Sequence, residues 1–171
     1  MARIAVVGAG AWGTALAAHA ARLDHAVTMW ALEPEVAEDI RERHENKLFL
    51  PRAPLPQSIG ASSDPAEVVT GADLVILVPP SSHLREVAAR MAPHVRRDAL
   101  VVVASKGIER GTLALMSQVI AEAMPEVGPD RLAVLSGPSF AREVVRGLPT
   151  NVVVAGRPIS AARAVQRLLH A

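Results

Sequence analysis

A glycine-rich turn near the N-terminus places the narrowest limits on the fold of this chain. Residues 8–13 read Gly-Ala-Gly-Ala-Trp-Gly, which is the spacing G-x-G-x-x-G. The turn directly follows the β-branched run 3–7 and opens the alanine-rich run 12–23, so we expect it to join a strand to a helix. A strand, a glycine-rich turn and a helix in this order are typical of the first βαβ unit of a parallel sheet.

Each glycine of this turn has its own expected task. Gly8 permits a tight turn, Gly10 lets a ligand approach the backbone, and Gly13 lets the helix lie close to the strand. The helix N-terminus offers free N–H groups and the positive end of its dipole to phosphates. Glu33 follows the second apolar run, about 20 residues after the turn, where a carboxylate can bind an adenosine ribose. The pattern predicts a site for NAD or NADP, with NAD favoured, and the alternative is an ordinary strand–turn–helix joint.

Short apolar runs alternate with helical patterns along the rest of the chain. Strands are expected at 3–7, 26–30, 59–62, 74–78, 100–104, 132–135 and 151–155. Helices are expected at 12–23, 34–45, 82–91, 112–124, 139–145 and 159–169, with a short helix starting at Pro65 after the cap Asp64. Because fully apolar strands need cover on both faces, this order predicts a Rossmann-like α/β fold with a doubly wound, mostly parallel sheet. We expect residues 1–171 to form one dinucleotide-binding domain.

The composition excludes several classes of protein and ligand. The chain has 18 Lys and Arg against 17 Asp and Glu, a balance that does not support a nucleic-acid partner. It has no cysteine, which excludes disulfides, thiolate zinc sites, iron–sulfur clusters and cysteine nucleophiles. Its six histidines lack the close helical spacing of metal ligands, and we expect no metal site. Three glycines interrupt the apolar stretch 4–21, so we expect neither a signal peptide nor a membrane span. We therefore expect a cytoplasmic protein.

Three segments follow predicted strands, and ligands of such sheets bind where parallel strands end. Pro79 and Pro80 end one strand, either as a plain strand stop or as a contact near the ligand. Lys106 follows the run 100–104, where it could bind an anion or polarise a substrate oxygen, or remain a solvated surface charge. Ser139 follows the next strand and is expected to be the N-cap of a short helix whose first N–H groups could bind a small anion.

Four short sequences occur in a specific order across nearly the whole chain. They are Gly-Ala-Gly-Ala-Trp-Gly-Thr-Ala-Leu at 8–16, Asn-Lys-Leu-Phe-Leu-Pro at 46–51, Lys-Gly-Ile-Glu at 106–109 and Leu-Ser-Gly-Pro-Ser-Phe-Ala-Arg-Glu at 135–143. Together they resemble the N-terminal domain of NAD(P)-dependent glycerol-3-phosphate dehydrogenase of the soluble bacterial type. The first is shared with many dinucleotide enzymes, whereas the last two together are far more specific.

The resemblance implies binding roles for particular residues. The cofactor would be bound by Gly8, Gly10, Ala11, Trp12, Gly13, Leu32, Glu33, Lys106 and Ala141, with Leu32 and Glu33 beside the adenosine ribose. The substrate, sn-glycerol 3-phosphate, would be bound by Lys106, Gly137 and Ser139. The family reaction transfers a hydride between NAD(P) and this substrate, interconverts it with dihydroxyacetone phosphate, and supplies the backbone of phospholipids in bacteria.

Two features of the sequence depart from the family pattern, and the C-terminal domain of the family has no counterpart in residues 1–171. Phe49 stands where tyrosine is usual, and Leu32-Glu33 stands where basic residues are common, which puts the usual NADP preference in doubt. The family continues into an all-helical C-terminal domain that carries the general-base lysine and an Arg-Asn pair for the substrate phosphate. This sequence reaches Ala171 inside a helical pattern, so we expect no catalytic residue in it and little or no turnover by it alone. A homodimer of the full-length protein stays open.

Two other functions stay open at this point. The same fold could be the cofactor half of a hydroxyacyl-CoA, 6-phosphogluconate or nucleotide-sugar dehydrogenase, although the segments 106–109 and 135–143 speak against it. The chain could instead be a stand-alone NAD-sensing module without catalysis. Binding of glycerol 3-phosphate would separate the first of these from the resemblance, and a downstream helical domain in the source gene would exclude the second.

Overall fold

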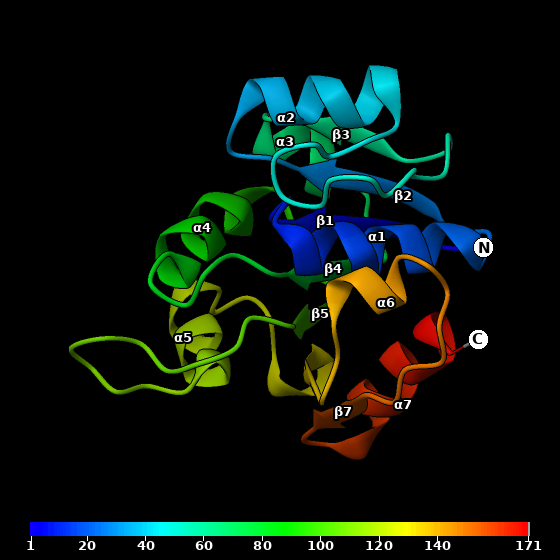
Figure 1. Cartoon of the computed structure of the whole chain (residues 1–171). Helices are drawn as coiled ribbons and strands as arrows, with labels where there is room; N and C mark the ends of the chain where they lie inside the picture. Colours follow the sequence, from blue (N-terminus) through cyan, green and yellow to red (C-terminus); the bar gives the residue numbers. More distant parts are fainter. Residues whose placement is uncertain (171) are drawn as a thin grey trace.

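Seven strands build one sheet in this computed structural model, which describes residues 1–170 (Figure 1). They are β1 (Arg3–Val7), β2 (Ala26–Trp30), β3 (Gly60–Ser62), β4 (Leu74–Leu77), β5 (Leu100–Val103), β6 (Leu132–Ser136) and β7 (Val153–Gly156). Their order across the sheet is β3-β2-β1-β4-β5-β6-β7. Neighbouring strands are parallel except β7, which pairs antiparallel with β6. The predicted doubly wound, mostly parallel sheet is confirmed.

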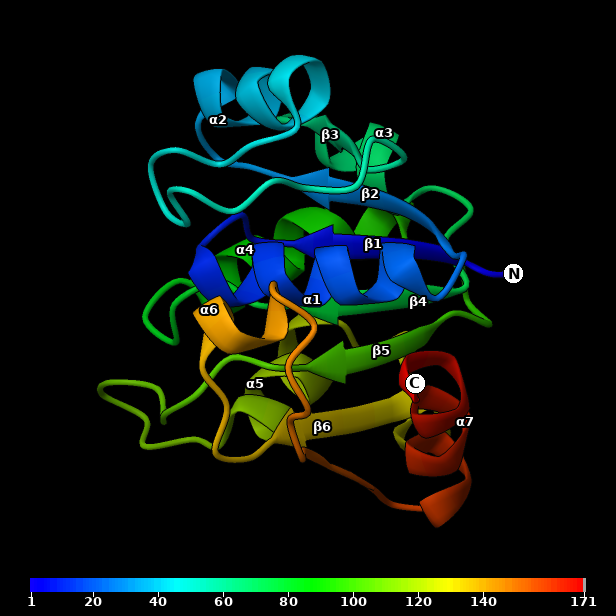
Figure 2. The same ribbon diagram turned by 45° about the vertical axis from the view of Figure 1, so that its right-hand side comes forward.

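Helices cover both faces of this sheet (Figure 2). The α-helices are α1 (Ala11–Arg22), α2 (Pro34–Glu38), α3 (Pro65–Val69), α4 (Leu84–Met91), α5 (Met116–Ala123), α6 (Ala141–Val144) and α7 (Ile159–Leu169). Shorter helical turns are η1 (Asp39–Arg43), η2 (Ala92–His94) and η3 (Pro129–Arg131). Helices α1, α2, α6 and α7 pack on one face, and α3, α4 and α5 pack on the other.

The two faces of a central strand enter separate cores. In β1, Ile4 and Val6 belong to the core beneath α1, whereas Ala5 and Val7 belong to the core beneath α4 and α5. These four residues are at most 2% exposed. A strand that is buried on both faces needs an apolar side chain at every position, which is why these strands read as continuous apolar runs in the sequence. Polar groups that could bind a ligand are therefore concentrated where the strands end.

Two helices differ from the sequence prediction at one end. Helix α5 begins at Met116 and not at 112, because the preceding residues form a loop that is closed by a bridge between Ile108 and Leu115. The predicted helix 34–45 consists of α2 and the π-helical turn η1, and it ends at His44 with a left-handed φ of 54°. The other strands and helices begin and end within two residues of their predicted ranges.

The segment before α6 corrects one further prediction. Helix α6 begins at Ala141 with Phe140 as its N-cap residue, so the prediction that Ser139 caps this helix is wrong. The Ser139 hydroxyl instead donates a hydrogen bond to the Gly137 carbonyl, at 3.3 Å. This bond stays within the turn after β6 and leaves the first N–H groups of α6 without a side-chain acceptor.

Two other kinds of feature do not occur within residues 1–170. None of their helices has the length and apolar character that a membrane crossing requires. The same residues bring no group of three or more His, Asp or Glu side chains together as a metal ion would need. A cavity does lie at the carboxyl edge of the sheet.

Candidate functional site

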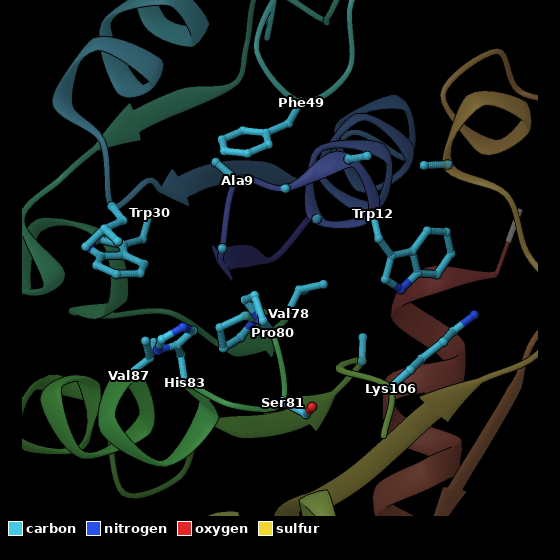
Figure 3. A pocket seen from close by; sticks show the side chains of 18 of the residues that line it. Ala9, Trp12, Trp30, Phe49, Val78, Pro80, Ser81, His83, Val87 and Lys106 are labelled. Carbon is cyan, nitrogen blue, oxygen red and sulfur yellow. The ribbon is translucent and has the colours of Figure 1, made fainter. Parts of the chain in front are cut away.

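The cavity opens where β1, β2, β4 and β5 end, and its volume is about 620 Å³. The strand order reverses beside β1, since β2 and β3 lie on one side of it and β4 to β7 on the other. Such a switch point creates the crevice in which doubly wound sheets bind their ligands. Figure 3 shows Trp12 and Lys106 at one end of the cavity and Trp30, His83 and Val87 at the other.

The three glycines of the turn 8–13 meet three different surroundings. Gly8 has φ +118°, and a Cβ there would lie 3.0 Å from the backbone carbon of Val78. A Cβ on Gly13 would lie 2.0 Å from the carbonyl oxygen of Gly8, so only glycine lets α1 approach the turn this closely. A Cβ on Gly10 would meet nothing within 4 Å, and Gly10 lines the cavity. The space beside Gly10 is thus free, which fits the close approach of a pyrophosphate.

Helix α1 begins beside the cavity without a side-chain cap. Its N-cap residue is Gly10, and its first turn holds no acidic residue. Ala11 and Trp12, the first two residues of the helix, line the cavity. Because the first N–H groups of a helix lack an acceptor within the helix and carry the positive end of its dipole, this part of the cavity suits a phosphate group.

Lys106 brings a positive charge to the same end of the cavity. Its Nζ donates a hydrogen bond to the Gly137 carbonyl at 3.2 Å and lies 5.8 Å from the centre of the Trp12 ring. The ion pairs found in residues 1–170 do not include Lys106. The indole Nε1 of Trp12 is buried and has no hydrogen-bond partner within the described part of the chain. The ammonium group can therefore interact with an anionic ligand, as the sequence-based hypothesis requires.

The loop that carries Lys106 is fixed against the loop after β4. The Ser105 hydroxyl donates a hydrogen bond of 2.6 Å to the Pro79 carbonyl. Gly107 adopts φ +121°, and a Cβ there would lie 3.1 Å from the Ser81 hydroxyl oxygen. Pro79 and Pro80 line the cavity, and the chain that they turn also supports the residues on either side of Lys106.

An ion pair anchors the far end of the same loop. Arg85 on α4 donates two hydrogen bonds of 2.8 Å to the Glu109 carboxylate and forms an ion pair with Glu122 on α5, also at 2.8 Å. The bonds from Arg85, with one from the Thr112 hydroxyl, lower the pKa of Glu109 to about 2. Glu109 is therefore a carboxylate throughout the physiological range, and it ties the loop to two helices.

The other end of the cavity lies beside β2. Leu32 and Glu33 line it, and Glu33 is the N-cap residue of α2 without a side-chain cap hydrogen bond. Trp30 completes this end, since its Nε1 donates to the Ser63 carbonyl at 3.0 Å and the Arg90 guanidinium lies 5.4 Å from its ring. The Glu33 carboxylate can thus accept hydrogen bonds from a ribose hydroxyl.

The structure brings the predicted site residues together around one cavity. All nine residues assigned to the cofactor line it, and so does Ser139 of the substrate set. Gly137 does not line it, but its carbonyl accepts the hydrogen bond from Lys106. The binding roles of these residues stay predictions.

The residues that line the cavity but are missing from the sequence prediction include Trp30, His83 and Val87. Trp30 is the last residue of β2, and its position at the end of a strand next to the glycine-rich turn is a signal that could have identified it. His83 and Val87 lie at the start of α4. Their place in the site depends on β4 lying beside β1, which no local sequence pattern shows.

A dinucleotide needs three things from a doubly wound sheet: room at the turn for its pyrophosphate, N–H groups to bind it, and an acceptor for a ribose hydroxyl. Groups suited to all three lie around this cavity, and the chain is of the class of Rossmann-like α/β domains. A protein-family model described as NAD-dependent glycerol-3-phosphate dehydrogenase N-terminus matches residues 3–162. The chain belongs to this family, so the resemblance seen in the sequence is confirmed.

Curated relatives and a solved structure agree with the family. The chain is 46% identical over 165 residues to glycerol-3-phosphate dehydrogenase (NAD(P)+) of Syntrophotalea carbinolica, covering 96% of this chain and 50% of that protein. It is 48% identical over 166 residues to the protein of the same name from Corynebacterium aurimucosum, covering 97% and 50%. The glycerol-3-phosphate dehydrogenase structure from Coxiella burnetii matches with TM-score 0.90 at 32% identity, covering 99% of this chain and 51% of that one. The chain spans about half the length of the curated relatives it matches.

Proposed function

We propose that this chain is the cofactor-binding domain of an NAD(P)-dependent glycerol-3-phosphate dehydrogenase, which interconverts sn-glycerol 3-phosphate and dihydroxyacetone phosphate. The observation that carries the proposal is the cavity, in which a turn that fits a pyrophosphate lies between the Glu33 carboxylate and the Lys106 ammonium group. The bound cofactor would donate or accept the hydride. In a bacterial cell the product would supply the backbone of phospholipids, and we place the protein in the cytoplasm, where nicotinamide dinucleotides are available.

Residues of the chain have two groups of roles in this proposal. Ala11 and Trp12 would bind the cofactor at the start of α1, and Glu33 would accept a hydrogen bond from the adenosine ribose. Lys106 would contact both cofactor and substrate, and its charge would stabilise the negative charge that develops on the substrate oxygen when the carbonyl is reduced. Ser139, together with Gly137, would hold the glycerol phosphate.

We also propose that residues 1–171 form the dinucleotide-binding domain and that a second, helical domain supplies the general base. The matched segment is 50% of the length of two curated relatives, which supports this division. Large apolar side chains at the carboxyl edge give further support, since Leu113 is 72% exposed, Phe140 69% and Val153 67%. A domain that docks there would cover these side chains and complete the site. A homodimer is a further option for such a protein, and its mass in solution would test it.

Calorimetric titration of the 171-residue chain tests the cofactor part of the proposal. NADH or NADPH should bind with one site per chain, whereas nicotinamide mononucleotide, which lacks the pyrophosphate, should bind far more weakly. A chain that is folded and binds neither dinucleotide would refute the assignment of the cavity.

A chimera tests the reaction. We would join this chain to the part of the Syntrophotalea carbinolica relative that follows the matched segment and measure NADH oxidation with dihydroxyacetone phosphate. The chimera should be active, and Lys106→Met in the same chimera should remove most of the activity while leaving NADH binding measurable. Cofactor binding without turnover in a folded chimera would favour the stand-alone NAD-sensing module. Turnover of 6-phosphogluconate or a hydroxyacyl-CoA in preference would favour the related dehydrogenases.

A further inference from the structure

Asn46 lies far from the glycine-rich turn in the sequence but contacts it in the fold. Its side chain is 1% exposed, and its amide Nδ2 donates to the Ala9 carbonyl at 2.7 Å and to the Thr14 hydroxyl oxygen at 2.8 Å. Its Oδ1 accepts a hydrogen bond from the Phe49 N–H at 3.1 Å. Since a carbonyl can only accept and a backbone N–H can only donate, these partners fix the orientation of the amide. Both hydrogens and the oxygen of the Asn46 amide are used.

The bond to Ala9 determines how the turn presents its backbone. In a planar trans peptide the C=O and N–H directions are opposed, so a carbonyl that is held by Asn46 turns the Gly10 N–H the other way. The hydrogen bonds found in residues 1–170 do not use the Gly10 N–H. Gly10 lines the cavity, and the space beside it is open. A free N–H at this place is what an anionic oxygen would accept from.

The same amide also fixes Phe49. The Phe49 ring is one of the side chains that line the cavity, beside the turn in Figure 3. Its N–H is held by Asn46 Oδ1, and the Leu50 N–H is held by the Asn46 carbonyl at 2.9 Å. One buried side chain thus links the backbone of the turn to an aromatic residue of the cavity wall.

We propose that Asn46 is a positioning residue of the cofactor site, which holds the Ala9–Gly10 peptide so that its N–H faces the pyrophosphate. The inference rests on the proposed function for the identity of the ligand. Asn46 does not line the cavity and acts through Ala9, Gly10 and Phe49. The buried Asn46 amide, and not water, binds the Ala9 carbonyl. This bond keeps the peptide from turning its carbonyl oxygen toward the ligand phosphate.

Two substitutions in the same network separate positioning from stability. Asn46→Leu removes the 2.7 Å bond to the Ala9 carbonyl. Thr14→Val removes a hydroxyl that is 0% exposed and donates a longer bond, 3.3 Å, to the same carbonyl, but it leaves the bond from Asn46 to Ala9 in place. Both variants should melt below the wild-type chain, because each leaves buried polar groups unpaired. The Kd for ADP-ribose should rise by about tenfold to a hundredfold in Asn46→Leu, the loss that follows when a donor to a charged oxygen is misplaced. In Thr14→Val it should stay within about threefold of wild type.

Asn46→Asp provides a conservative variant in which protonation of the carboxyl group supplies one O–H donor in place of the amide N–H groups. Burial disfavours the carboxylate, so this aspartate should be neutral in mild acid and should then donate to the Ala9 carbonyl. With wild type measured at each pH, its Kd for ADP-ribose should approach that of wild type at about pH 5 and weaken as the pH rises toward about 8. Asn46→Leu, which has no charge, should be weak at both pH values and excludes simple charge repulsion as the cause.

The outcomes separate this inference from the proposed function. If wild type binds ADP-ribose and a folded Asn46→Leu or Asn46→Asp binds it equally well at pH 8, the positioning role of Asn46 is wrong. Equal losses in Asn46→Leu and Thr14→Val would also overturn it, because stability alone would then explain both. If wild type does not bind ADP-ribose or NADH, the proposed function fails first.

Discussion

Replacing Gly13 by alanine should destabilise the fold, whereas the same change at Gly10 should leave the fold intact and act on the ligand. At Gly13 the added Cβ would lie 2.0 Å from the Gly8 carbonyl oxygen, a separation that real Cβ atoms do not show. The neighbour is backbone, and it cannot retreat, because Gly8 itself approaches the Val78 backbone with φ +118°. The helix and the turn would have to move apart.

The expected magnitudes follow from these distances. Overpacking typically costs about 1–3 kcal/mol, and a backbone clash of this depth belongs at the upper end. A loss of about 3 kcal/mol lowers the melting temperature of a domain of this size by about 6–12 °C. Gly10 has φ −64° and ψ 174°, which any residue can adopt, so Gly10→Ala should change stability by about 1 kcal/mol or less. Gly10→Val should weaken dinucleotide binding by about a hundredfold, since it fills the space that the ligand needs.

Thermal unfolding followed by circular dichroism, and calorimetric titration with NADH, measure the two effects separately. Gly13→Ala is expected to lose stability, and Gly10→Val is expected to lose NADH binding at nearly unchanged melting temperature. A Gly13→Ala chain that melts together with wild type would refute the packing argument. A folded Gly10→Val chain that binds NADH like wild type would refute the assignment of the turn.

Three further predictions concern charge and catalysis. Glu33→Arg should shift preference from NADH toward NADPH by roughly tenfold to several hundredfold, because a 2′-phosphate about 4 Å from the carboxylate is repelled by about 1 kcal/mol in water and about 4 kcal/mol at an effective dielectric of 20. Equal Kd values for NADH and NADPH in wild type would contradict a role of Glu33 in binding the ribose. The pKa of Glu109 is lowered to about 2, so its ion pair with Arg85 stabilises the fold fully above about pH 4.3, and this stabilisation is lost as the pH falls toward 2. Wild type should therefore be more stable than Glu109→Gln at neutral pH and should lose this advantage between about pH 4.3 and 2. NADH oxidation with dihydroxyacetone phosphate by the chain alone should be about a hundredfold to ten-thousandfold slower than by a full-length relative, since no general base is expected in it. Turnover at the rate of a relative would contradict this.

The sheet could be predicted because its signals are local. Each central strand is a run of mainly β-branched and apolar residues, and Gly8 and Pro79 mark the ends of two of these runs. The start of α5 could not be predicted in this way. Residues 112–115 continue the helical pattern, but Glu109 is paired with Arg85, 24 residues earlier, and the loop closes on itself at Leu115. A long-range contact here overrides local helix propensity.

The site could be predicted as far as it is written in contiguous motifs. The turn 8–13, Glu33 and Lys106 each follow a strand, and the topology then brings them to one cavity. Asn46 belongs to the segment 46–51, but its partner Ala9 is 37 residues away, so its contact with the turn depends on the fold. The same holds for His83, whose position beside the cavity depends on β4 pairing with β1.

The order of the strands also determines a direction along the cavity. Glu33 follows β2, the uncapped start of α1 follows β1, and Lys106 follows β5, so the acceptor, the phosphate site and the cation are arranged in that order across the sheet. Under the proposed function, a dinucleotide that places its adenosine ribose at Glu33 brings its other end toward Lys106. If the dinucleotide bound in the opposite orientation, the Glu33 carboxylate would face the nicotinamide end, and Lys106, the cation proposed to bind the substrate, would lie beside the adenine. The chain carries a net charge of only +1, so it is this local arrangement, and not the overall charge, that would orient the cofactor and place an anionic substrate next to its reacting ring.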